Sequence, residues 1–196
     1  METIHDPAEA LADIRTMMAR SSKFLSLSGL AGISAGITAL IGAAAAYWEL
    51  YASNSPDPTL FMLLDAIGVL FCAVACAVFF TRRMARNLGI PAWSNTTKYI
   101  LDSLLVPLCA GGIFCLLLWN GGYALLIGGV TLLFYGVALI NTSKFIAPEV
   151  RYFGFLEMVL GLFAIAAPAN WLIFWAFGFG AAHIVYGSVV FAKYEK

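Results

Sequence analysis

Residues 99–119 read YILDSLLVPLCAGGIFCLLLW, and residues 123–143 read YALLIGGVTLLFYGVALINTS. These two stretches contain a single charged side chain, Asp102, and are separated only by Asn120-Gly121-Gly122. The hydrocarbon core of a bilayer is roughly 30 Å thick, and an apolar helix of about 20 residues crosses it. We therefore predict two membrane-spanning helices that are joined by a tight turn.

The rest of the chain has the same character, because 62% of its 196 residues are hydrophobic and 11% are charged. Soluble domains average about 45–50% apolar and about 25% charged residues, and a chain this short cannot bury so much apolar surface in water. Four more segments have the length of a span: 24–48, 59–80, 150–167 and 171–192. The predicted fold class is all-α, a polytopic membrane protein with six transmembrane helices as three tandem hairpins.

The basic residues support this count, because six spans place all eleven of them on one face of the membrane. They are Arg15, Arg20, Lys23, Arg82, Arg83, Arg86, Lys98, Lys144, Arg151, Lys193 and Lys196. The positive-inside rule makes that face cytoplasmic, so both termini are expected there, in a bacterial inner membrane. The longest connection is expected at residues 81–98. The first apolar run is too long for a signal-peptide core, and we interpret it as a mature span.

Residues 1–23 are predicted to form a cytoplasmic amphipathic helix, ahead of a single six-helix domain at 24–196. Asp6-Pro7-Ala8-Glu9 has the pattern of a helix start, and Leu11, Ile14 and Met18 share one helical face. Such a helix lies on the membrane surface. One interpretation is that it only anchors the first span; the other is that it docks a cytoplasmic protein partner.

An internal repeat links the fourth and sixth predicted spans, because Gly129, Tyr135 and Gly136 recur 51 positions later as Gly180, Tyr186 and Gly187. Parallel repeats of this kind are related by an axis along the membrane normal. Small residues mark contacts between membrane helices, either within one chain or between copies in a homo-oligomer. The predicted helix-packing positions are Ser28, Gly32, Gly36, Gly129, Gly136, Gly161, Gly180 and Gly187.

The segment Gly154-Phe155-Leu156, followed by Leu160-Gly161-Leu162-Phe163-Ala164, Pro168, Gly178 and Ile184-Val185-Tyr186-Gly187, resembles the hairpin unit of the HdeD-like acid-resistance membrane proteins of bacteria. The resemblance covers mainly residues 150–192 and more faintly 100–143. It implies a similar length, six spans and glycine-rich helices, with no catalytic residues to carry over. The basic segment 81–98 and the carboxylates within the spans depart from that family.

Ionisable side chains within membrane spans are costly, which makes them functional candidates. The candidate intramembrane polar site consists of Asp65, Asp102, Glu157, His183, Tyr186 and Asn141. Asp65, Gly68, Cys72 and Cys76 share one helical face, which we expect to point into the bundle.

Glu157 and His183 lie on helices that a short turn joins, so these two side chains can meet. Such a pair could relay a proton or sense pH. Alternatively it is a hydrogen-bonded pair that only fixes the register of the helices, or the two side chains do not touch. Asp102 is expected to reach the headgroups or a loop arginine, and Pro107 to kink its helix and free a carbonyl.

No metalloprotease, P-loop, dinucleotide or nucleophile-elbow motif occurs in the sequence, so no catalytic residue, cofactor or metal is predicted. The net charge of zero gives no reason to expect a nucleic-acid partner. The leading hypothesis is a non-enzymatic bacterial inner-membrane protein with a stress, envelope or regulatory role. The alternatives are a small transporter or channel for protons or a small solute, which requires the four ionisable residues to line one cavity, and, last, an intramembrane enzyme.

Overall fold

The computed structural model describes residues 28–53, 55–89, 91 and 93–195, and the described chain is helical, with no strand. The helix predicted at residues 1–23 and the start of the first span lie outside these residues. The long helices are α2 (Gly29–Tyr51), α3 (Thr59–Asn87), α4 (Asn95–Asn120), α5 (Ile127–Thr142) and α6 (Pro148–Ala166). The last long helical segment consists of α7 (Trp171–Trp175), the π-helical η3 (Ala176–Ala182) and α8 (His183–Tyr194). The 3₁₀ turns η1 (Ala124–Leu126) and η2 (Pro168–Asn170) precede α5 and α7.

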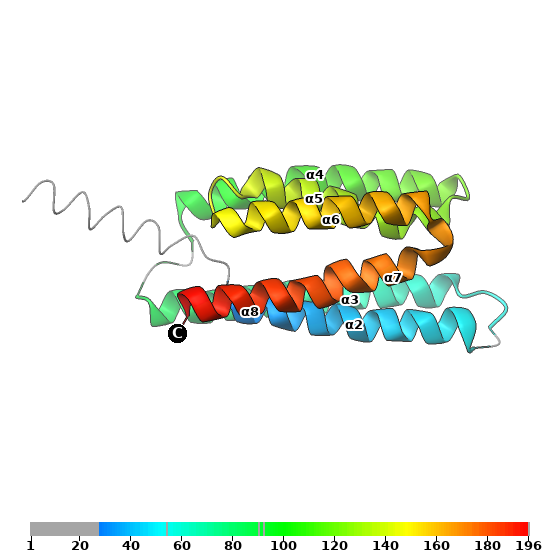
Figure 1. Ribbon diagram of the computed structural model, residues 1–196, viewed down its shortest axis with the longest axis horizontal. Coiled ribbons are helices and arrows are strands. Elements are labelled where there is room, and N and C mark those ends of the chain that lie inside the picture. The colour runs from blue at the N-terminus through cyan, green and yellow to red at the C-terminus, as the bar shows by residue number, and fades with distance from the viewer. Residues whose placement is uncertain (1–27, 54, 90, 92, 196) are drawn as a thin grey trace, which may run out of the picture.

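The helices form two layers, one of α4, α5 and α6 and the other of α2, α3 and α8 (Figure 1). In the first layer α5 packs against both α4 and α6, and in the second α2 packs against both α3 and α8. The segment α7–η3 crosses between the layers at one end. As a result α6 and α8 lie in different layers, and α6 contacts the crossing segment α7–η3 that links them.

Five helices among the described residues are long and apolar enough to cross a membrane. They span Gly29–Tyr51, Thr59–Asn87, Asn95–Asn120, Ala124–Thr142 and Pro168–Tyr194. The all-α fold and the presence of several helices that are long and apolar enough to cross a membrane are thereby confirmed. The remaining helix, α6, has 19 residues, about 28 Å at 1.5 Å per residue, but carries Glu149, Arg151 and Glu157. The count of six spans and the three-hairpin repeat stay predictions.

The connection expected at residues 81–98 is much shorter in the structure, because α3 continues to Asn87 and α4 begins at Asn95. The basic residues of the last turns of α3 are good helix formers, so they extend the helix beyond its apolar part. Gly89 then takes a left-handed conformation with φ of 65°, which glycine adopts without steric cost. The Ser94 hydroxyl accepts the Thr97 N–H at 3.1 Å and caps the start of α4.

Two antiparallel helix pairs approach each other closely through glycines that are seven residues apart. In the first layer Gly129 and Gly136 of α5 face Gly161 and Gly154 of α6. A Cβ atom at Gly136 would lie 2.6 Å from Gly154 O and 2.6 Å from Met158 N, closer than atoms can approach. Only glycine permits this contact between backbones, as the predicted packing role of these positions requires.

The second layer repeats this arrangement, with α2 in the place of α6 and α8 in the place of α5. Gly29 and Gly32 of α2 face Gly187 of α8, and Gly36 faces Gly180 of η3. A Cβ at Gly187 would lie 2.6 Å from Ile33 N, and the Leu40 side chain of α2 lies against Gly180. The repeat in the sequence therefore corresponds to two equivalent helix contacts, and both join helices from different predicted hairpins.

The expectation for α3 was wrong in part, because Gly68 and Cys72 are exposed and a Cβ at Gly68 would meet nothing within 4 Å. The contact face of α3 instead contains Asp65 and Val69, which lie against Gly42 of α2. Among the described helices α3 packs extensively against α2 alone, and most of its side chains are exposed. Gly68 and Cys72 therefore do not mark the interior of the bundle.

Asn141 and Pro107 form a structural contact between α4 and α5. A proline at position 107 has no N–H for the carbonyl of Ser103, four residues earlier. The Asn141 Nδ2 donates a hydrogen bond to this same Ser103 oxygen at 2.9 Å. Asn141, which the sequence placed in the candidate polar site, thus satisfies the carbonyl that the proline leaves free.

We predict that Asn141→Leu destabilises the protein by about 1–3 kcal/mol, because the half-buried Ser103 carbonyl loses its donor. The double variant Asn141→Leu with Pro107→Ala should recover most of this loss, since alanine at 107 supplies a backbone N–H. Unfolding in mixed micelles measures both free energies. Equal losses in the single and double variants would contradict this pairing.

Candidate functional site

Glu157 is the centre of the candidate site and lies in the middle of α6, facing α5 and η3. Its side chain is 0% exposed, and neither carboxylate oxygen has a hydrogen-bond partner among the described residues. The space for the carboxylate comes from Gly178 of η3, where a Cβ atom would lie 2.6 Å from Glu157 Oε2. A buried polar group without hydrogen bonds is costly, so its retention needs a reason beyond packing.

His183, the first residue of α8, is the closest polar neighbour of Glu157. Its Nδ1 lies 3.4 Å from Glu157 Oε1 and 3.0 Å from the Gly178 carbonyl oxygen. Its Nε2 lies 2.9 Å from the Tyr135 hydroxyl of α5. The contact between Glu157 and His183, one of the possibilities that the sequence left open, is therefore present.

The π-helical turn η3 explains how His183 reaches the Gly178 carbonyl, which lies five residues earlier. In a π-helix a carbonyl faces the residue five positions later, so the Gly178 carbonyl lies next to His183. A carbonyl oxygen has two lone pairs, and one of them can accept from the imidazole. Short π-helical segments occur frequently at functional sites.

The hydrogen bonds assign the protons of a neutral His183 ring. A carbonyl oxygen can only accept, so Nδ1 carries a hydrogen and donates it to Gly178 O. Nε2 is then the acceptor, and the Tyr135 hydroxyl donates to it. If Nε2 gains a proton, the Tyr135 hydroxyl must turn so that its oxygen accepts.

Aromatic rings surround the polar pair and exclude water from it. Phe153 of α6 meets the His183 ring edge-on at 4.7 Å, and Phe179 and Tyr135 stack beside it at 5.7 and 5.3 Å. These residues come from both layers of the fold. The pair therefore joins α6 to η3–α8 at the point where the two layers meet.

Burial also restricts the charge of the pair, because an isolated charge in an apolar interior costs far more than a neutral group. A Glu157 carboxylate beside a neutral His183 would be such a charge, and so would an imidazolium beside a neutral Glu157. The pair is neutral when it holds one proton, either on the carboxyl or on the imidazole. One shared proton is thus the favoured state of this site.

The other predicted site residues lie elsewhere. Asp65 is half-buried at the contact of α3 with α2, and Asp102 is exposed on α4. Asn141 bonds to the backbone of α4, as described above. Tyr186 lies next to the site, because its ring stacks on Phe153 with centroids 4.6 Å apart. The sequence thus predicted two members of the central site, Glu157 and His183, and one neighbour, Tyr186.

Tyr135 and Gly178 belong to the site, and our sequence interpretation did not include them. Tyr135 was visible as part of the internal repeat, where the shift of 51 aligns it with Tyr186. The structure places these two tyrosines on opposite layers with Phe153 and His183 between them. Gly178 was noted only within the resemblance to the HdeD-like hairpin, and its role beside Glu157 depends on the π-helical turn.

Within the described part of the chain, no group of three or more His, Cys, Asp or Glu side chains is arranged to hold a metal ion. The four cysteines, Cys72, Cys76, Cys109 and Cys115, are free thiols on α3 and α4, away from Glu157. No protein-family model, curated protein or solved structure matches this chain. The chemistry of the site therefore rests on its own geometry.

Proposed function

We propose that this chain is a non-enzymatic bacterial inner-membrane protein with a regulatory or stress-related role, in which proton binding at Glu157 and His183 controls how the two helix layers pack. The single observation that carries this proposal is the fully buried Glu157 carboxylate, which lies 3.4 Å from His183 Nδ1 and has no hydrogen bond within the part of the chain that the structure describes. A change of its protonation state creates or removes a buried charge at the junction of the layers. Packing must respond to such a change.

The proposal includes six membrane spans with both termini in the cytoplasm. Support comes from the ends of the helices, because the α3–α4 and α5–α6 connections and the end of α8 lie at the same end of the bundle (Figure 1). The basic side chains Arg86, Lys98, Lys144 and Lys193 belong to these segments. By the positive-inside rule this end faces the cytoplasm, with α6 as the additional span.

The arrangement of the ionisable residues favours regulation over transport. A transporter of the kind considered above needs Asp65, Asp102, Glu157 and His183 along one cavity. Asp65 and Asp102 belong to α3 and α4, at the margins of the layers, whereas Glu157 and His183 are enclosed by aromatic rings. The resemblance to HdeD-like acid-resistance proteins is compatible with a response to pH and adds no mechanism.

The test uses the protein in liposomes, as wild type, Glu157→Gln and His183→Ala. We expect proton flux at the level of the lipid leak in all three. We also expect hydrogen–deuterium exchange of residues 176–194, corrected for intrinsic rates, to change with pH between about pH 4 and pH 9 in the wild type, an interval that extends beyond the ordinary pKa values of glutamate and histidine on both sides. Glu157→Gln should remove this change, since glutamine keeps the shape without the titrating group.

If the wild type shows proton flux above the lipid leak and Glu157→Gln abolishes it, the result would support a transport function and contradict the regulatory one. A wild-type exchange pattern that does not depend on pH would contradict both functions. Asp102→Asn is the matched control, because Asp102 is an exposed carboxylate on α4. Its pH response should equal that of the wild type.

A further inference from the structure

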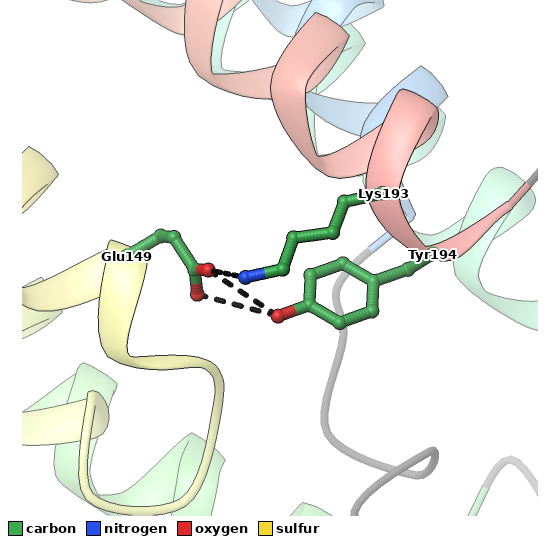
Figure 2. A network of polar contacts seen from close by, with 3 residues as sticks. All are labelled: Glu149, Lys193 and Tyr194. Atoms are coloured by element: carbon green, nitrogen blue, oxygen red, sulfur yellow. Dashed lines mark hydrogen bonds and ion pairs between the residues drawn. The ribbon is translucent and has the colours of Figure 1, made fainter.

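Some of the basic side chains at one end of the bundle are bound within the protein. The Lys193 ammonium of α8 donates to Glu149 Oε1 of α6, and the Tyr194 hydroxyl lies 3.3 and 3.4 Å from the two Glu149 oxygens. Figure 2 shows the Lys193 and Tyr194 side chains converging on this carboxylate. Arg151 of α6 lies over the Phe155 ring, 5.7 Å from its centroid. These two cations therefore have partners within the protein.

Three arginines near the end of α3, Arg82, Arg83 and Arg86, form a different group, which we call the arginine face. All three side chains are exposed, and within the part of the chain that the structure describes their guanidinium groups have no hydrogen bond, ion pair or aromatic ring contact. The exposed lysines at this end, Lys98 and Lys144, stand singly on α4 and after α5. A cluster of three cations without a carboxylate partner attracts anions.

A row of exposed apolar side chains continues from the arginine face toward the middle of α3. This apolar row consists of Phe71, Val78 and Phe79. With 3.6 residues per turn, each of them lies within about 60° of Arg82 around the helix axis, and so does Arg86. One side of α3 therefore changes from apolar to cationic near the end of the helix.

The length of α3 places this change at the surface of a membrane. The helix has 29 residues, about 43 Å at 1.5 Å per residue, whereas the hydrocarbon core of a bilayer is roughly 30 Å thick. Its mostly apolar part, residues 59–80, is about 33 Å long and suffices to cross the core. The turns that follow, which carry the arginine face, then reach the headgroup region, and the apolar row lies beside the acyl chains.

We propose that the arginine face binds anionic phospholipids through the headgroup phosphate, with the acyl chains along the apolar row. The guanidinium group matches two phosphate oxygens at once, and a basic cluster directly beside a membrane helix is typical of anionic-lipid recognition. A soluble anionic partner would use the arginines without the apolar row that continues from them. This inference goes beyond the proposed function, because it does not involve the buried Glu157–His183 pair.

The test measures how tightly the full chain, in neutral detergent micelles, binds phosphatidylglycerol and phosphatidylcholine with the same acyl chains, by native mass spectrometry. The wild type should bind phosphatidylglycerol at least about tenfold more tightly, since each basic side chain near an anionic surface contributes about fivefold. The combined variant Arg82→Gln, Arg83→Gln and Arg86→Gln should lose this preference and bind phosphatidylcholine as the wild type does.

The matched control combines Lys98→Gln, Lys144→Gln and Arg151→Gln. It removes the same charge at the same end of the bundle, from side chains that do not form a cluster on one helix. It should keep most of the preference for phosphatidylglycerol. Far-UV circular dichroism checks that each variant retains its helices.

Equal affinities of the wild type for the two lipids would overturn the proposal. Equal losses in the two combined variants would also overturn it, because they would indicate attraction by net charge instead of a site. Displacement of phosphatidylglycerol by inorganic phosphate alone would exclude a role of the acyl chains and overturn the choice of a lipid.

A second measurement does not depend on the folding of any variant. Phosphatidylglycerol with a photoreactive headgroup, in vesicles that contain the wild type, should label α3 between Phe79 and Asn87. Labelling that is confined to other helices would contradict the proposed site.

Discussion

Replacing Gly136 with alanine should destabilise the protein by about 1–3 kcal/mol, and replacing it with leucine by more, because the added atoms force α5 and α6 apart. A Cβ at this position would lie 2.6 Å from both Gly154 O and Met158 N, and backbone atoms cannot move aside as a flexible side chain does. The α5–α6 contact runs along both helices through paired glycines, so its separation exposes the whole seam. Unfolding by SDS in mixed micelles measures the change.

Gly68 provides the matched control, since it is also a glycine within a long membrane helix. A Cβ there would meet nothing within 4 Å. Gly68→Ala should be neutral or should stabilise the protein by up to about 1 kcal/mol, the helix propensity of alanine over glycine. Gly187→Ala, in the equivalent contact of the other layer, should behave like Gly136→Ala. Equal effects at positions 68 and 136 would refute the close contact.

The second large effect concerns pH. Above about pH 7 an unfolded chain in which Glu157 and His183 are solvated binds no proton at these residues, given ordinary pKa values of about 4.3 and 6.5. The folded pair retains one proton, for the reason given above. Because the folded state then binds more protons, the free energy of unfolding should fall by about 1.4 kcal/mol per pH unit as the pH rises, until the folded pair itself releases its proton.

Below about pH 4 the sign reverses, because the unfolded state then binds two protons at these residues and the folded pair one. Stability from this pair is thus greatest between the two ordinary pKa values. In Glu157→Gln the decline above pH 7 should disappear, since neutral glutamine and neutral His183 bind no titrating proton in either state. The measurement is SDS-induced unfolding at a series of pH values, and an unchanged slope above pH 7 in Glu157→Gln would refute the one-proton pair.

How much of this the sequence revealed differs from feature to feature. The apolar stretches at 99–119 and 123–143 predicted helices that the structure contains, because a helix satisfies its own backbone hydrogen bonds and needs no distant partner. The recurrence of Gly129 and Gly136 as Gly180 and Gly187 predicted close helix contacts, and glycine on a membrane helix has few other uses. Both inferences depend on local chemistry alone.

The candidate site was predicted only in part. Glu157 and His183 were visible as ionisable residues in apolar segments, but the stripe through Gly68 and Cys72 pointed to the wrong face of α3. A stripe of small residues shows where another helix can approach closely, but it does not show whether another helix does so. Among the described helices α3 has one extensive neighbour, α2, so Gly68 and Cys72 of its small-residue stripe remained exposed.

The sequence by itself determined the solvent of this protein, its helical spans and the residues that permit close backbone contact, because each follows from the side chains within one segment. The tertiary structure alone decided which helices share the glycine contacts, placed α6 and α8 in different layers, and brought Tyr135, Glu157 and His183 together around Gly178. These depend on how the helices pair across the chain and on one π-helical turn, which rotates His183 toward the carboxylate. The fold therefore has two helix layers, each with a close contact through paired glycines, and the buried Glu157–His183 pair lies where the layers meet.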